Sequence, residues 1–97
     1  MREVNINNNK GAVMDKPQIK YIDDKPPTLE EMQEYVGGYI QVVDAHNGDQ
    51  IVMDEEGKMK GKSINYEATK HWIGENANAY DYVVGDAVIL SGKARLS

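Results

Sequence analysis

Hydrophobic side chains recur at helical spacing between residues 29 and 36. They are Leu29, Met32, Tyr35 and Val36. Spacings of three or four residues place such side chains on one face of an α-helix. Thr28 and Glu31 have the spacing of a capping box, in which each side chain bonds a free backbone N–H at the start of a helix. The pattern therefore predicts a helix over residues 29–36.

Two glycines follow this helix, and the hydrophobic period then changes. Gly37 can take the left-handed conformation that ends many helices, and Gly38 offers a second flexible joint. From residue 39 to 43 the side chains alternate, with Ile40 and Val42 on one face of a predicted strand. We expect the helix to fold back over the sheet that this strand joins.

Turn signals separate the elements that follow. Asn47-Gly48 predicts a two-residue type I′ hairpin turn, and residues 50–54 predict the returning strand. Asp54-Glu55-Glu56 is interpreted as a solvated turn, with Gly57 in its left-handed position. Residues 58–62 then predict a short polar strand or an extended connection, whose lysines would protect a sheet edge.

The second half of the chain predicts one more helix and more strands. Residues 64–73 place hydrophobic side chains at helical spacing, with Ser63 or Asn65 as the cap. Residues 80–84 and 87–90 have the composition of strands. The run at 87–90 is the most continuously hydrophobic, which predicts a central place in the sheet.

These elements predict an α+β fold. Its sheet would be small and antiparallel, with about four to five strands, and two helices would pack on it. With a further strand at 18–22, we expect one α+β domain over residues 18–92. Residues 1–17 form an N-terminal segment that could add an edge strand, and residues 93–97 form a polar tail.

The composition excludes several classes of function. Sixteen acidic and eleven basic residues give a net charge of −5, and only Arg2 and Arg95 are arginines, which argues against duplex nucleic acid as a partner. There is no cysteine, so disulfides and thiolate chemistry are excluded. No hydrophobic run approaches the ~20 residues that span a membrane, and no signal-peptide core is present. We expect a cytoplasmic protein with no membrane partner.

No complete catalytic motif is present in the sequence, so we expect neither enzymatic activity nor a cofactor. Asp44, His46 and Asp49 lie within six residues and could hold a divalent metal ion. The same residue types also favour a turn around Asn-Gly for backbone reasons. A metal site and a simple turn are therefore the two interpretations of this stretch.

Three lysines follow the second turn. Residues 57–63 resemble a phosphate-binding P-loop, but three residues separate the two glycines where that motif has four. Lys58, Lys60 and Lys62 would bind phosphate groups in one interpretation and line an exposed edge in the other.

The start of the second helix carries a further set of candidate binding residues. Asn65 and Thr69 are four residues apart and could present hydrogen-bonding groups on one helix face to a ligand or partner. Tyr66 would add a ring for stacking. In the alternative interpretation, Asn65 caps the helix and Ala68 packs against the sheet.

Five short motifs follow one another along the chain. They are Thr28-Leu29-Glu30-Glu31-Met32-Gln33, Val36-Gly37-Gly38-Tyr39-Ile40, Asp54-Glu55-Glu56-Gly57-Lys58, Asn65 with Ala68-Thr69, and Val84-Gly85-Asp86. In this order they resemble a family of small domains of unknown function from bacteriophages and bacterial mobile elements, over residues 18–92. The resemblance implies a phage or phage-derived origin and a compact α+β domain. It assigns no catalytic residue and no cofactor.

Three functional hypotheses follow. The leading one is a non-catalytic phage accessory protein that binds a partner, such as a host protein, in the host cytoplasm. The second is an oligomeric small-molecule binder that takes up a nucleotide signal on its tyrosine rings and lysines. The third is a metal-assisted enzyme that uses Asp44, His46 and Asp49.

Overall fold

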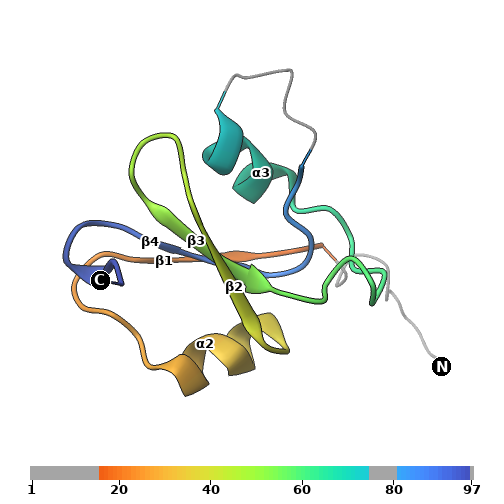
Figure 1. Cartoon of the computed structure of the whole chain (residues 1–97), viewed down its shortest axis with the longest axis horizontal. Coiled ribbons are helices and arrows are strands. Elements are labelled where there is room, and N and C mark those ends of the chain that lie inside the picture. The colour runs from red at the N-terminus through yellow and green to blue at the C-terminus, as the bar shows by residue number, and fades with distance from the viewer. Residues whose placement is uncertain (1–15, 75–80, 97) are drawn as a thin grey trace, which may run out of the picture.

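Four strands form one mixed sheet in the computed structural model, which describes residues 16–74 and 81–96 (Figure 1). The strands are β1 (Ile19–Ile22), β2 (Ile40–Asp44), β3 (Gln50–Asp54) and β4 (Ala87–Leu90). Their order is β1-β4-β3-β2. The β2–β3 and β3–β4 pairs are antiparallel, whereas β1 is parallel to β4. The predicted α+β fold is confirmed, but the sheet is mixed rather than wholly antiparallel. No hairpin connects β1 to β4, so the chain can enter β1 in the parallel direction.

Helices α2 (Leu29–Val36) and α3 (Tyr66–Ile73) lie on opposite faces of the sheet (Figure 1). Met32 and Val36 of α2 pack in one hydrophobic cluster, and Ala68 of α3 packs in another. Because strand side chains alternate in direction, β3 and β4 supply both clusters. The members of the α2 cluster from these strands are Val52, Val88 and Leu90, and those of the α3 cluster are Ile51, Met53, Ala87 and Ile89.

The predicted limits of α2 are confirmed. The backbone N–H of Glu31 donates to the Thr28 Oγ1 atom over 3.1 Å, and the backbone N–H of Thr28 donates to the Glu31 carboxylate over 2.8 Å. Gly37 ends the helix with a φ of 85°. The predicted hydrophobic stripe is wrong at one position, because Leu29 is 54% exposed. Leu29 is the first residue of a short helix whose buried side chains, Met32 and Val36, lie further along.

The hairpin between β2 and β3 is confirmed at Asn47-Gly48, but its turn is wider than predicted. The backbone N–H of Ala45 donates to the carbonyl of Asp49 over 2.7 Å, and the N–H of Gly48 donates to the carbonyl of Ala45 over 3.0 Å. Gly48 has a φ of 94°. The loop therefore has three residues, because the ladder closes at Ala45 and Asp49 rather than next to Asn47.

The predicted strand or extended connection over residues 58–62 is wrong. Residues 55–61 form successive turns, in which the backbone N–H of Lys60 donates to the carbonyl of Glu56 over 3.0 Å. The predicted left-handed Gly57 is also wrong, since its φ is not positive. Glycine is required at position 57 because the packing leaves no room for a side chain. A Cβ atom there would lie 2.7 Å from Cγ2 of Val84.

The second helix and the central strand follow the sequence more closely. Asn65 caps α3, as one of the two predicted candidates, and Ile64 lies outside the helix in a single bridge to Val84. The predicted strand over 80–84 is wrong in its described part, since residues 81–83 are irregular and only Val84 forms that bridge. All four residues of β4 are buried and β4 lies inside the sheet, as predicted.

The two ends of the chain differ in how far they are described. The predicted N-terminal edge strand falls almost wholly on residues 1–15, outside the described part. After β4, a short 3₁₀ helix (η1, Gly92–Ala94) buries Ala94 against the α2 cluster, and Leu96 packs there too. Within residues 16–74 and 81–96, neither helix has the length and hydrophobicity that crossing a membrane requires.

The tight approach of Gly57 to Val84 gives a direct test of this packing. We expect Gly57→Ala to lower the free energy of unfolding by about 1–3 kcal/mol, because the added methyl overpacks a closed contact. Urea denaturation measures the change. Val84→Ala removes the obstructing methyl groups, so the double variant should lose less stability than the sum of the two single changes. Additive losses would contradict the contact.

Candidate functional site

The buried carboxylate of Asp54 is the centre of a charged network at the end of β3. Its side chain is fully buried, on the same face of the sheet as α2. The Nζ atoms of Lys60 and Lys62 lie 2.8 and 2.7 Å from its Oδ2 atom. The backbone N–H of Glu56 donates to its Oδ1 atom over 2.9 Å. The interpretation of Asp54 as a solvated turn residue is therefore wrong.

The same two lysines bind the C-terminal end of α2. Lys62 Nζ donates to the carbonyl of Val36 over 2.7 Å, and Lys60 Nζ donates to the carbonyl of Gly37 over 3.1 Å. These carbonyls lack partners inside the helix and carry the negative end of its dipole. The helix has no basic residue in its own last turn. Lysines from a distant turn therefore supply the cations that α2 lacks.

Glycines make room for this network. A Cβ atom on Gly38 would lie 2.7 Å from Lys60 Nζ and 2.8 Å from the Asp54 Oδ1 atom. A Cβ atom on Gly85 would lie 2.8 Å from Cδ of Lys62. The predicted flexible joint at Gly38 is thus a position where the charged groups leave no space for a side chain.

The network fixes the charge state of Asp54. Burial alone would raise the pKa of this carboxyl, but hydrogen bonds from Lys60, Lys62 and the Glu56 backbone outweigh burial and lower it from 3.8 to about 2. The carboxylate therefore stays ionised at neutral pH. A buried charge of this kind is stable only while its partners remain in place.

Lys58 belongs to a second, more exposed contact. Its ammonium group forms an ion pair with Asp81 and lies 4.3 Å from the centre of the Tyr82 ring. The hydrogen bond from Lys58 is the main cause that lowers the pKa of Asp81. All three predicted phosphate-binding lysines therefore already pair with carboxylates of this chain.

The predicted pair Asn65 and Thr69 lies together, but its polar groups bind the chain itself. Asn65 is buried, and its amide nitrogen donates to the carbonyls of Gly85 over 2.9 Å and Gln18 over 3.2 Å. Thr69 Oγ1 donates to the carbonyl of Asn65 and accepts from the N–H of Val83, each over 2.8 Å. Both side chains thus join α3 to the segments that precede β1 and β4, as in the structural interpretation of Asn65.

The three metal candidates are not brought together. Asp49 accepts a hydrogen bond within its own turn from Asn47 and lies 2.9 Å from Nε2 of His71. His46 packs over Gly74, whose added Cβ would lie 3.0 Å from its Nε2 atom. No three acidic or histidine side chains within residues 16–74 and 81–96 form a group that could hold a metal ion. The geometry thus gives no support to metal-assisted chemistry at Asp44, His46 and Asp49.

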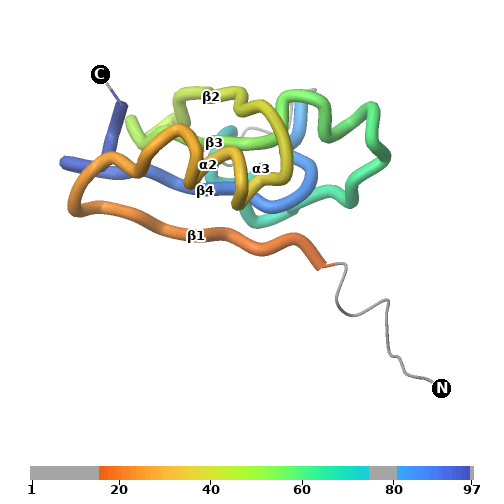
Figure 2. The backbone as a smooth tube through the Cα atoms, turned by 90° about the horizontal axis from the view of Figure 1, so that it is seen from below, coloured from red at the N-terminus to blue at the C-terminus, as the bar shows by residue number. Residues whose placement is uncertain are grey.

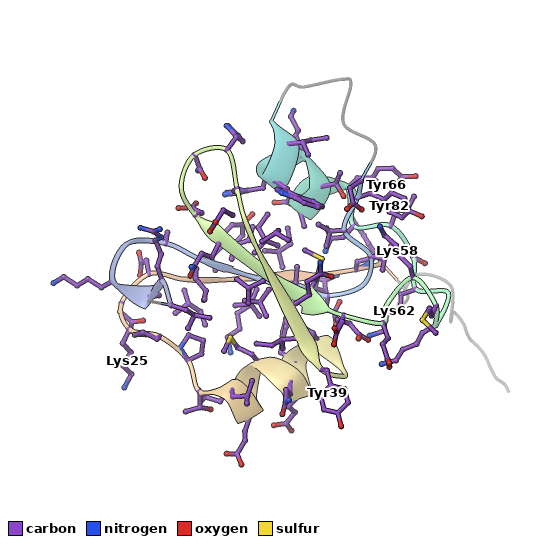
Figure 3. All side chains as sticks on the ribbon, in the orientation of Figure 1. Lys25, Tyr39, Lys58, Lys62, Tyr66 and Tyr82 are labelled. Atoms are coloured by element: carbon purple, nitrogen blue, oxygen red, sulfur yellow. The ribbon has the colours of Figure 1, made fainter. Side chains whose placement is uncertain are left out.

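Three exposed hydrophobic side chains belong to the turn of residues 55–62 and to two segments that follow it. Met59 is 87% exposed, Tyr66 76% and Tyr82 38%. Figure 3 shows Tyr66 and Tyr82 on the same side of the molecule as Lys58. We call Met59, Tyr66 and Tyr82 the tyrosine–methionine surface. Of these, the sequence singled out only Tyr66.

A shallow polar groove of about 440 Å³ is lined in part by the end of the same turn. Lys16, Lys60, Lys62, Ser63 and Asp86 are among the residues that line it. Two of its three lysines are held by Asp54, so little positive charge remains for a phosphate group. The groove is thus a poor match for an anionic ligand.

These observations define a small α+β domain in which the predicted phosphate-binding lysines pair with carboxylates of the chain itself. Residues 11–95 match the family described as "Domain of unknown function (DUF3846)", and the chain belongs to this family. The family resemblance in the sequence is thus confirmed at the level of a domain of unknown function. Searches of curated proteins and of solved structures gave no match.

The Asp54 network predicts a specific acid sensitivity. Because the folded-state pKa lies below the unfolded value, its contribution of about 2 kcal/mol is fully present above pH 4 and is lost as the pH falls towards 2. Asp54→Asn should cost about 2–3 kcal/mol at pH 7, since two lysines lose their partner. Urea denaturation from pH 7 to pH 2 should show a shallower loss of stability in this variant.

Asp44→Asn is the matched control, because Asp44 is an exposed strand residue whose side chain has no hydrogen bond or ion pair among the described residues. We expect this variant to stay within about 0.5 kcal/mol of the wild type at pH 7. Equal stability of Asp54→Asn and Asp44→Asn would contradict a structural role for the buried carboxylate.

Proposed function

We propose that this chain is a non-catalytic accessory protein of a bacteriophage or mobile element, which acts in the host cytoplasm by binding a host protein. The observation that carries the proposal is the tyrosine–methionine surface, which exposes Met59 in the turn, Tyr66 at the start of α3 and Tyr82 beside Lys58. Tyrosine and methionine are enriched in the cores of protein interfaces, where charged residues are depleted. The five sequence motifs support the phage origin.

The charges around this surface favour a protein over an anionic ligand. Lys58 is paired with Asp81, and Lys60 and Lys62 are paired with Asp54. Paired charges of this kind suit the polar, solvent-accessible rim that surrounds the hydrophobic core of a protein interface. A phosphate ligand would instead have to compete with carboxylates for each lysine.

A second candidate is the oligomeric binder of a nucleotide signal. The groove lined by Lys16 and Ser63 is the observation that favours it, because Lys16 has no carboxylate partner among the described residues. Its shallowness and the commitment of Lys60 and Lys62 make it the weaker candidate.

Affinity capture with matched variants tests the leading proposal. The tagged full chain is expressed in a bacterial host, and both proteins and small molecules that copurify are identified. A protein partner should then bind the purified wild type, and Met59→Ser/Tyr66→Ser should weaken that binding at least about tenfold, because truncated anchor residues dominate interface energy. Isothermal titration calorimetry measures the change.

Leu29→Ser is the matched control, since Leu29 is exposed to a similar degree but lies on α2. It should bind the partner as the wild type does. The proposal fails if no protein is enriched, or if the partner binds Met59→Ser/Tyr66→Ser with unchanged affinity. Recovery of a nucleotide alone would support the second candidate instead.

A further inference from the structure

Strand β2 forms an open edge of the sheet. Figure 2 shows β2 at one margin and β1 at the opposite margin, with β3 and β4 between them. Edge strands expose backbone groups that can pair with another strand, and proteins usually block them with lysine, proline or a bulge. The sequence of β2, Ile40–Asp44, contains no lysine or proline, and its register with β3 is regular.

The hydrogen bonds at its two ends show which residues of β2 face outward. The N–H of Glu55 donates to the carbonyl of Tyr39, and the N–H of Ala45 donates to the carbonyl of Asp49. In an antiparallel pair, bonded and non-bonded positions alternate. Tyr39, Gln41, Val43 and Ala45 therefore bond towards β3. The backbone groups of Ile40, Val42 and Asp44 point to the open side.

The row of outward-facing backbone groups ends at the same distance from Val42 in both directions along the strand. The N–H of Gly38 already donates to the carbonyl of Gln33 over 3.1 Å, and the N–H of His46 donates to the carbonyl of Trp72 over 3.0 Å. Between these two positions, the backbone N–H and C=O groups of Ile40, Val42 and Asp44 have no partner within the described residues. The centre of this row is Val42.

We propose that β2 pairs with β2 of a second copy of this chain, antiparallel and about a two-fold axis at Val42. Each of Ile40, Val42 and Asp44 then donates one hydrogen bond and accepts one across the axis, and the two sheets become continuous. An unpaired row that is symmetric about its own centre fits an identical strand, as two-fold interfaces require.

The side chains in this register are compatible. Val42 lies opposite Val42 of the second copy, and Ile40 lies opposite Asp44, so no like charges face each other. The Val42 side chain is 37% exposed in the single chain, and pairing would cover it. Helix α2 packs mainly on β3 and β4, which leaves room beside β2 for the second copy.

The size of the contact sets the expected affinity. A pair of five-residue strands covers less than the ~1,000 Å² that a stable specific interface buries. We therefore expect a weak dimer whose population rises with concentration. This pairing involves β2 and does not depend on the tyrosine–methionine surface.

Amide hydrogen exchange and sedimentation on the full chain test the pairing without a mutation. As the dimer fraction measured by sedimentation rises with concentration, the amides of Ile40, Val42 and Asp44 should become protected in proportion. The amides of Gln41 and Val43 already bond to β3 and should not change. A chain that stays monomeric at millimolar concentration, or protection that appears elsewhere, overturns the proposal.

Charge substitutions at the two-fold axis give the second test. Val42→Lys and Val42→Glu each place like charges opposite one another and should weaken self-association at least about tenfold. An equimolar mixture of the two variants should restore the dimer as a mixed pair, which native mass spectrometry detects. A misfolded variant would not be rescued in this way.

The outcomes of the mixing experiment are decisive. Restoration of a mixed dimer from two monomeric variants supports a two-fold axis at Val42. Dimers that persist in Val42→Lys alone would place the interface on another surface and overturn the proposal. A mixture that stays monomeric while the wild type dimerises would also overturn it, because opposite charges at the axis should attract.

Discussion

One buried carboxylate joins three separate parts of this domain. Asp54 ends β3, and the lysines that neutralise it come from the turn that follows and also bind the last carbonyls of α2. The strand, the turn and the helix end therefore depend on the same few charged groups. A charge without water is costly unless every partner is present, so this arrangement fixes the turn of residues 55–62 against the sheet. Lys58 and Met59 lie in the turn that is held in this way.

The local parts of the fold could be predicted from the sequence. The capping box of Thr28 and Glu31, the helix end at Gly37 and the buried run of β4 all depend on residues close together in the chain. The hairpin lies at Asn47-Gly48, as the sequence predicts, although its turn has three residues. Neighbouring residues determine caps, turns and alternation, and a single sequence contains that information.

Contacts between distant residues could not be predicted. Nothing in the spacing of Lys60 and Lys62 indicates that they bind the end of α2, and the parallel pairing of β1 with β4 joins strands far apart in the chain. One signal was available. Val52 and Asp54 share a strand face, so a carboxylate at an inward position had to find partners. The glycines of two sequence motifs, Gly38 and Gly85, give space to the same lysines. These motifs therefore describe packing, which explains why they do not identify a reaction.

The residues that looked most like ligand-binding groups hold the domain together, whereas the described part of the chain also presents exposed tyrosine and methionine side chains and the outer edge of β2. Both remaining features are suited to binding other chains. The most direct measurement of the central claim is an NMR titration of the Asp54 side-chain carboxyl carbon in the folded protein. A midpoint at about pH 2 is expected if Lys60 and Lys62 neutralise a buried carboxylate. A midpoint near 3.8, the ordinary value for aspartate, would show that Asp54 is not held by the lysines and would contradict the account.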